Sequence, residues 1–285
     1  MSIRGSLLAV GFFCCVLTAQ AWAQPPQHVR AEVLADVSSV QAGKPFWLGV
    51  RLSVDPGWHV YWKNPGDAGL PTQVKFTVPD GFTVGPLQYP TPQRIDQAGN
   101  ILALAYEDSV LLLAKVTPPD HLPADFHGEF QAAISWLVCS QVCLPGKATE
   151  SLTLGASESA QPANRELFDQ WISQLPVDAN ESADVADVHS NADNKGDCSI
   201  EIAWRSGTPD SVEFLPGTLD DYTIGNTVVK SSHHTTVISF TVQPLAGMSP
   251  PPTTLEAVVG YASKDGKRRG AKISVALPSW SANNR

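Results

Sequence analysis

Residues 135–147 read SWLVCSQVCLPGK and place Cys139 and Cys143 four positions apart. The run before the pair, residues 130–138, alternates loosely between apolar and polar side chains, as a strand does, and Pro145-Gly146 is a turn signal. We therefore expect both thiols where a strand enters a tight loop near the surface. Two cysteines in such a place can form a disulfide with little movement of the backbone.

Upstream of this stretch the apolar pattern is that of short strands. Residues 46–54 alternate, and a turn at residues 55–57 leads into a second strand at 58–63. Alternate side chains of that second strand share a face: Trp58, Val60 and Trp62 on one, and His59, Tyr61 and Lys63 on the other. Further strands are expected near 74–78, 110–116, 126–138 and 148–154. About seven short strands, with turn signals roughly every ten residues, predict a β-sandwich.

Residues 79–100 are rich in proline, glycine and polar side chains and include YPTPQRID at 89–96. This composition predicts a long irregular loop rather than a strand. A long irregular loop within a compact domain is commonly functional.

Downstream of the cysteines the pattern changes twice. Apolar residues recur at helical spacing (Leu167, Phe168, Trp171, Ile172 and Leu175) and stop at Pro176, which predicts an amphipathic helix over about 163–175. Residues 178–197 are acidic and nearly free of large apolar side chains, which predicts a mobile linker. Strand patterns then return at 200–204, 212–215, 237–242, 255–261 and 273–277, which predict a second, smaller sandwich.

The sequence as a whole therefore predicts an all-β protein. Two immunoglobulin-like β-sandwich modules, at 24–155 and 198–280, are joined across 156–197 by a short helix and an acidic linker. The second module shows no cluster of catalytic residue types, so we interpret it as a structural or partner-binding module. Its basic cluster (Lys264, Lys267, Arg268 and Arg269) is expected at a solvated hairpin tip.

The first 23 residues have the form of a secretory signal peptide. Arg4 supplies the positive region, residues 7–17 an apolar core, and residues 21–23 a small-x-small cleavage site. The mature chain is expected to begin near Gln24, and loss of Arg4 takes the formal charge from −9 to −10. We therefore expect an exported, soluble, periplasmic protein in an oxidising compartment, where disulfides persist. This negative net charge argues against nucleic acids and anionic membrane surfaces as partners.

Cys139 and Cys143 admit three interpretations on spacing alone. As a staple, a disulfide closing so short a loop contributes on the order of 2 kcal/mol, which a sandwich of this size does not need. As a metal site, two thiolates can hold Cu(I), whereas a structural zinc needs four ligands. As a redox couple, the pair would exchange with other thiols. The third cysteine of the mature chain, Cys198, is expected to be a lone thiol or a partner for another chain.

Three motifs in order, WLVCSQVCLPGK (136–147), GWHVYWKNPGDAGLP (57–71) and YPTPQRI (89–95), resemble the periplasmic N-terminal domain of the DsbD family of thiol:disulfide interchange proteins. The likeness covers residues 29–154 and is greatest to the ScsB branch, which is linked to suppression of copper sensitivity. The resemblance implies a protein-disulfide reductase-type shuttle without a cofactor. The alternatives that we keep are a Cu(I)-binding or copper-tolerance module and a non-catalytic sandwich with a structural disulfide.

The resemblance also implies roles for individual residues. By position, Cys143 would form the mixed disulfide with a partner and Cys139 would resolve it. His59 and Tyr61 would lie beside the couple, and the segment 89–100 would take the place of a shielding cap. We expect Trp136, and from the cap segment Tyr89 and Asp96, to complete the environment of the couple.

The partners implied by the resemblance are a membrane electron donor and periplasmic thioredoxin-like proteins. This sequence contains neither the membrane domain nor the C-terminal thioredoxin domain of full-length family members, so we expect a separate donor of the DsbD or CcdA type. Two effects on the thiol pKa oppose one another. His59 or Lys147, if protonated nearby, would lower the pKa, and burial would raise it.

Overall fold

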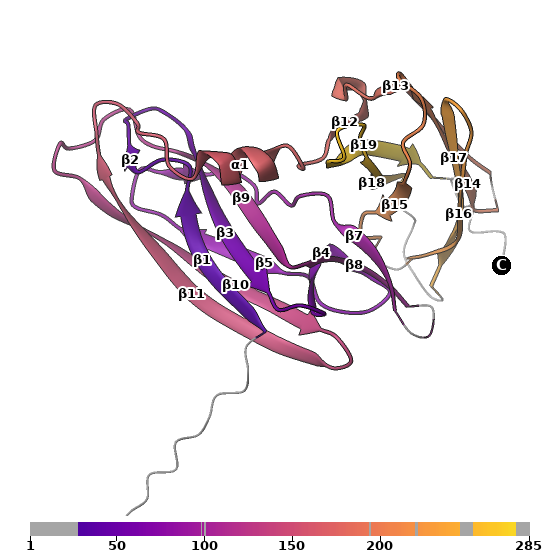
Figure 1. Cartoon of the computed structure of the whole chain (residues 1–285), viewed down its shortest axis with the longest axis horizontal. Coiled ribbons are helices and arrows are strands. Elements are labelled where there is room, and N and C mark those ends of the chain that lie inside the picture. Colours follow the sequence, from indigo (N-terminus) through magenta and orange to yellow (C-terminus); the bar gives the residue numbers. More distant parts are fainter. Residues whose placement is uncertain are drawn as a thin grey trace, which may run out of the picture.

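The structure is a computed structural model that describes residues 28–97, 99, 101–193, 195–219, 222–245 and 253–277. Strands make up most of these ranges, and one α-helix occurs within them (Figure 1), which confirms the all-β prediction. The expected signal peptide lies outside the described residues. Across the described ranges, no helix is long and apolar enough to cross a membrane.

Two sheets enclose the first core. One has the strand order β1 (Val29–Ala35), β3 (Phe46–Val54), β9 (Ser109–Thr117), β6 (Thr83–Val84). The other has the order β2 (Ser39–Val40), β11 (Cys143–Ala156), β10 (His127–Cys139), β4 (His59–Gly66), β8 (Ile101–Glu107), β7 (Gln93–Gln97), and β5 (Gln73–Thr77) also pairs with β10. The predicted alternation in β3 holds, because Leu48, Val50 and Leu52 are fully buried between the sheets.

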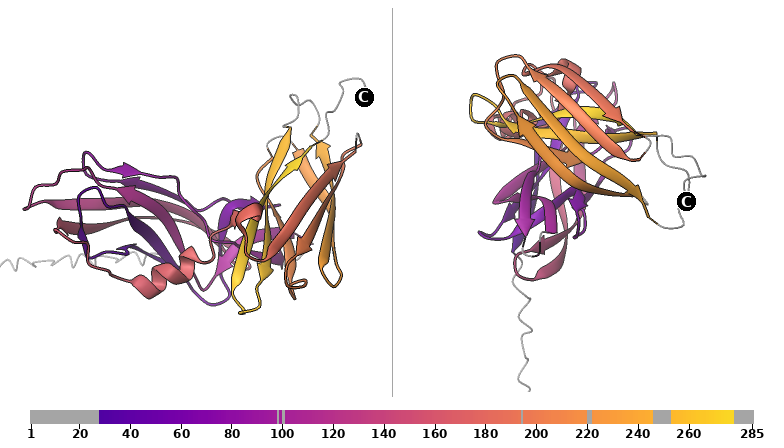
Figure 2. Two further views of the ribbon diagram at one scale, coloured as in Figure 1. Left: turned by 90° about the horizontal axis from the view of Figure 1, so that it is seen from above. Right: turned by 90° about the vertical axis from the view of Figure 1, so that its right-hand side faces the viewer.

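Two further sheets enclose a second core. Their orders are β12 (Val177–Asp178), β19 (Arg268–Ala276), β18 (Thr254–Ala262), β15 (Val212–Pro216), and β13 (Val185–Ala192), β14 (Asp197–Trp204), β17 (Thr235–Pro244), β16 (Tyr222–Ser231). Figure 2 shows this second pair of sheets against one end of the first, the end at which β7 and β8 lie in Figure 1. We call the two pairs of sheets the first and second units.

The helix is shorter than predicted. α1 spans Arg165–Ile172, and its buried residues, Phe168 and Trp171, pack on the core of the first unit. Beyond it the chain forms tight turns, in which Gln174 and Leu175 donate to carbonyls three residues earlier. Pro176 keeps the helix from continuing beyond these turns, because a proline disfavours helical backbone in the residue before it, here Leu175.

The acidic segment 178–197 is not the linker that its composition predicted. It contains the short 3₁₀ helix η1 (Ala179–Glu181) and the strand β13, which pairs along its length with β14. Val185 is buried, whereas most other side chains of β13 are exposed. An edge strand needs few apolar residues when its backbone hydrogen bonds join it to a packed neighbour, which is why composition misled the prediction.

Residues 79–100 are likewise more regular than predicted. They contain β6, a bridge between Gln88 and Leu113, and β7, which forms a hairpin with β8. The hairpin β7–β8 occupies the edge of the larger sheet next to β4. The end of this segment is therefore an edge strand of the larger sheet, whereas most of residues 79–92 are irregular, as predicted.

Candidate functional site

The cysteine pair closes the end of the hairpin β10–β11. Cys139 is the last residue of β10 and Cys143 the first of β11, and they face one another across the hairpin with their Cα atoms 4.2 Å apart, joined by a disulfide. The turn is formed by residues 140–142, in which the Ser140 N–H donates to the Val142 carbonyl. The thiols thus lie at the end of a strand beside a tight loop, as predicted.

The predicted turn at Pro145-Gly146 is wrong, because both residues lie inside β11, opposite Leu137 and Trp136. Over this part β11 pairs only with β10, since β2 joins it at residues 155–156 alone. Proline is tolerated on such an edge. The glycine is explained by Trp136, because a Cβ at Gly146 would lie 2.6 Å from Cζ2 of the indole.

The two cysteines differ in exposure. Cys139 is completely buried, whereas Cys143 is exposed. An attacking thiolate must reach a sulfur along the line of the S–S bond, so accessibility decides which sulfur reacts. The hairpin therefore leaves Cys143 accessible to solvent and keeps Cys139 inside the protein.

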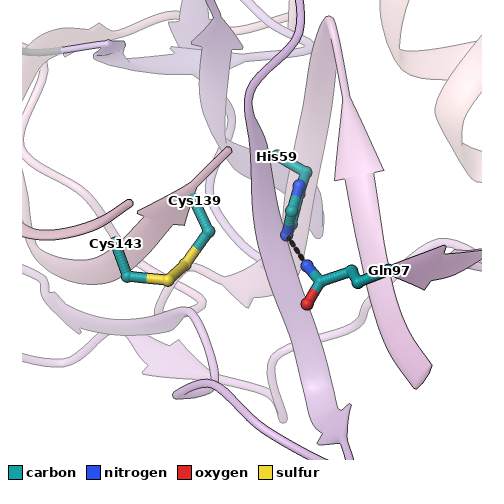
Figure 3. Close-up of a disulfide and its surroundings, with 4 residues drawn as sticks. All are labelled: His59, Gln97, Cys139 and Cys143. Carbon is teal, nitrogen blue, oxygen red and sulfur yellow. Dashed lines mark hydrogen bonds between the residues drawn. A yellow bond between two sulfur atoms is a disulfide. The ribbon is translucent and has the colours of Figure 1, made fainter. Parts of the chain in front are cut away.

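His59 and Tyr61 belong to β4, the strand that pairs with the end of β10, and Figure 3 shows His59 there with its ring directed at Gln97. His59 is the cross-strand partner of Cys139 between β4 and β10, and its ring packs edge-on against Tyr61 with centroids 5.2 Å apart. Tyr61 belongs to one small apolar cluster with Cys139, Ala103 and Ala105. The faces of β4 are those predicted, since Val60 and Trp62 lie instead in the core of the first unit.

His59 is held as a neutral side chain. Burial lowers its pKa below the ordinary 6.5, and the nearby Glu107 partly opposes that shift. Its Nε2 lies 2.9 Å from the amide nitrogen of Gln97 (Figure 3), so the amide donates and the ring nitrogen accepts. Since a protonated ring could not accept this bond, the contact and the burial favour the same charge state.

The other three predicted site residues lie further from the sulfurs or face away from them. Trp136 faces the core of the first unit, the side of β10 opposite to Cys139. The Tyr89 hydroxyl donates to the Thr72 carbonyl at 2.8 Å and borders the contact between the units. Asp96 is largely exposed and pairs with Arg94 at 2.9 Å.

Sequence reasoning missed the residues of β7 and β8 that do face the couple. Ile95 packs on the cluster that contains Cys139, and Gln97 holds His59. Gly69, whose φ is +114°, lies against the ring of Tyr61. The alternation of β7 could have revealed Ile95 and Gln97, since they share one face and Arg94 and Asp96 the other.

Cys198 is a free thiol within β14, 3% exposed. Burial and two aspartates raise its pKa to about 11, so little thiolate forms at neutral pH. Within the described part of the chain, no group of three or more His, Cys, Asp or Glu side chains could hold a metal ion.

The first unit is thus a pair of packed sheets that carries a disulfide at the end of one hairpin, with one of its two cysteines exposed. Residues 26–155 match the family model described as "Thiol:disulfide interchange protein DsbD, N-terminal". This confirms the resemblance seen in the sequence. No curated protein matches the chain.

Among solved structures, the N-terminal periplasmic domain of ScsB from Proteus mirabilis is similar over 88% of this chain and 95% of its own, with a TM-score of 0.65 and 20% identity. At this identity the likeness shows a shared fold, here across both units. The periplasmic chaperone SfaE and the E. coli chaperone DraB match with TM-scores of 0.24 and 0.22 and identities of 8% and 10%, over 86% and 85% of this chain and 99% and 98% of their own. Those scores are too low to carry an argument.

Proposed function

We propose that this protein performs thiol–disulfide interchange through the Cys139–Cys143 couple. It would accept electrons from a separate membrane protein and pass them to periplasmic thioredoxin-like proteins. The observation that carries the proposal is the unequal exposure of the two cysteines on one hairpin, within a segment of the DsbD N-terminal family. The periplasmic location is proposed from the expected signal peptide and from the similar periplasmic domain of ScsB.

In the reductive half of the cycle, a thiolate of the donor attacks Sγ of Cys143. The S–S bond breaks, and its electron pair leaves on Sγ of Cys139, which takes up a proton. The second thiol of the donor then attacks the mixed disulfide, so the donor leaves oxidised and both cysteines are thiols. Two electrons and two protons have moved.

In the oxidative half, the Cys143 thiolate attacks the disulfide of a thioredoxin-like acceptor. Cys139 then attacks Sγ of Cys143 within the mixed disulfide, which restores the couple and releases the acceptor as a dithiol. Buried on the hairpin opposite Cys143, Cys139 is placed for this internal step and shielded from other oxidants.

The scaffold supports such a cycle because it does not depend on the bond. Closing a loop this short stabilises the fold by only about 2 kcal/mol in the chain-entropy description. The register of β10 and β11 continues for twelve further residue pairs beyond the cysteines. We therefore expect the reduced protein to keep its fold.

Trapping separates the roles of the two sulfurs. Cys139→Ser leaves an exposed thiol without its resolving partner, so a mixed disulfide with an oxidised thioredoxin-like protein should accumulate on non-reducing gels. Cys143→Ser is the matched control, and its buried Cys139 should give little adduct. Equal adducts from both variants, or none from either, would refute the assignment.

The reduction potential of the wild-type couple tests the same proposal independently. A value of roughly −120 to −270 mV is expected for exchange, whereas one below about −300 mV would identify a structural disulfide.

A further inference from the structure

The segment that leads into β7 is held by parts of the chain from both units. The Tyr106 hydroxyl, on β8, donates to the Pro90 carbonyl at 2.6 Å. Thr91 donates from both its N–H and its Oγ1 to the Gln174 carbonyl beyond α1, each at 2.9 Å. From the second unit, Nε of Arg268 donates to the Pro92 carbonyl at 2.7 Å, and Nη2 reaches the same oxygen.

Arg268 is therefore not at the solvated hairpin tip that its sequence neighbours predicted. It lies at the start of β19 with 20% of its side chain exposed. Its Nη2 also forms an ion pair with the Glu213 carboxylate at 2.5 Å. Its neighbour Arg269 behaves differently, because it pairs with Asp184 and Asp265, both of the second unit. Of these two adjacent cations, Arg268 is the one with a hydrogen bond to the first unit.

The second unit also has a hollow for this segment. Gly260 and Gly270 are cross-strand partners on β18 and β19, and Thr91, 3% exposed, lies against both. A Cβ at Gly270 would overlap Oγ1 of Thr91. The absence of side chains at these two positions lets Thr91 enter the sheet surface of the second unit.

The next residues of the chain connect this contact to the disulfide. β7 begins one residue after Pro92 and is an edge strand, paired with β8 alone. Its Ile95 covers the cluster around Cys139, and its Gln97 holds His59. An edge strand is among the elements of a sheet that open most easily. Contacts that hold the first end of β7 therefore reduce how often the strand opens and exposes the residues around Cys139.

We propose that Arg268 is a positioning residue for the redox couple. By its hydrogen bonds to the Pro92 carbonyl, Arg268 of the second unit holds β7 in contact with His59 and with the apolar cluster around Cys139. Cys139 thereby stays covered. This gives the second unit a task in the chemistry of the first, and it builds on the proposed function. The physical claim, protection of one sulfur by a contact from the other unit, is measurable without any exchange partner.

The test is alkylation of the reduced protein by iodoacetamide, followed at each cysteine by mass spectrometry. Cys143 is the exposed reference, and Cys198, buried in β14, reports opening of the second unit. Arg268→Gln should raise the ratio of Cys139 to Cys143 alkylation about tenfold, the change in an opening equilibrium expected when a hydrogen bond from a charged donor is lost. Alkylation of Cys198 should not change.

Three further variants sharpen the test. Gly270→Ala should raise the same ratio by displacing Thr91, and Arg268→Lys should give an intermediate value, because an ammonium lacks the planar fork that reaches both Pro92 and Glu213. Arg269→Gln, the matched control, should leave the ratio as in the wild type.

An unchanged ratio in both Arg268→Gln and Gly270→Ala overturns the proposal. So does a rise of Cys198 alkylation in parallel with that of Cys139, which would mean that Arg268 only stabilises its own unit. The result is independent of the proposed function, since a couple inert towards thioredoxin-like proteins would still show the protection. Failure of exchange with this protection intact would refute the function and leave the positioning role standing.

Discussion

Replacing Gly69 by alanine should disturb the wall of the disulfide site more than the same change at any open turn. The Gly69 backbone has φ +114°, and a Cβ there would lie 2.5 Å from Cζ of Tyr61. The Tyr61 ring cannot move away from the new Cβ, because it is 2% exposed and packed on Ala103 and Ala105. The loop must therefore lift or the ring must push on its neighbours.

The expected cost combines two effects. An alanine held at a backbone conformation reserved for glycine costs on the order of 1–3 kcal/mol. Overpacking against a fixed side chain costs a further amount of about 1–3 kcal/mol. The sum, about 2–6 kcal/mol, is a large part of the stability of an ordinary domain.

Urea denaturation of the oxidised protein measures this cost, and Gly57→Ala is its control. Gly57 has φ +79° and nothing within 4 Å of its Cβ position, so it should show the backbone cost without the overlap. In a Tyr61→Leu background the excess cost of Gly69→Ala over Gly57→Ala should shrink below about 1 kcal/mol, since the two nearest ring atoms, Cε1 and Cζ, are gone. If Gly69→Ala costs no more than Gly57→Ala in the wild type, the packing described for Tyr61 is wrong.

Three more predictions concern the titration, the free thiol and the core. Because burial lowers the folded-state pKa of His59 below 6.5, the unfolded chain binds more protons there, and stability should fall as pH drops from 6.5 towards the lowered value. His59→Gln should flatten this part of the profile of urea midpoint against pH, and an unchanged slope would contradict it. Cys198→Ala should leave the rate of exchange with thioredoxin-like proteins as it is, since a buried thiol with a pKa of about 11 offers little thiolate, and a slower rate would assign Cys198 a role. Trp136→Phe should lower the free energy of unfolding by about 1–3 kcal/mol, as core truncations do, without changing the Cys139 to Cys143 alkylation ratio. A changed ratio would place the indole beside the sulfurs after all.

The local parts of the fold could be predicted because they arise from local patterns. The alternation of residues 46–54 and 58–63 identified β3 and β4 and put His59 and Tyr61 together on one face, which the structure turns away from the main core. The strong apolar stripe at 167–175 identified the helix.

The wrong secondary-structure predictions fall where pairing with a neighbouring strand, rather than local composition, decides the structure. β13 is a strand because β14 lies beside it, and its acidic residues contain no sign of that neighbour. The turn at residues 140–142 contains neither glycine nor proline, whereas Pro145 and Gly146 sit in a strand because one edge is open and an indole lies opposite.

The same limit applies to the site. The contact of Gln97 with His59 joins residues 38 positions apart, and that of Arg268 with Pro92 joins residues 176 apart. Neither is encoded in any local periodicity. The contacts of Gln97 and Arg268 therefore required the three-dimensional arrangement, whereas the cysteine pair could be located from the sequence.

The shared boundary of the two units has a practical consequence for anyone who expresses the chain in pieces. Leu215 and Val258 of the second unit are buried in the hydrophobic cluster of the first, and the Asn64 amide donates to the Pro216 carbonyl at 2.8 Å. A fragment that stops after β11 would leave the apolar surface under these side chains, and under α1, open to water. Such a fragment should be more prone to aggregate than the intact chain. Measurements on the disulfide are therefore better made on a chain that contains both units.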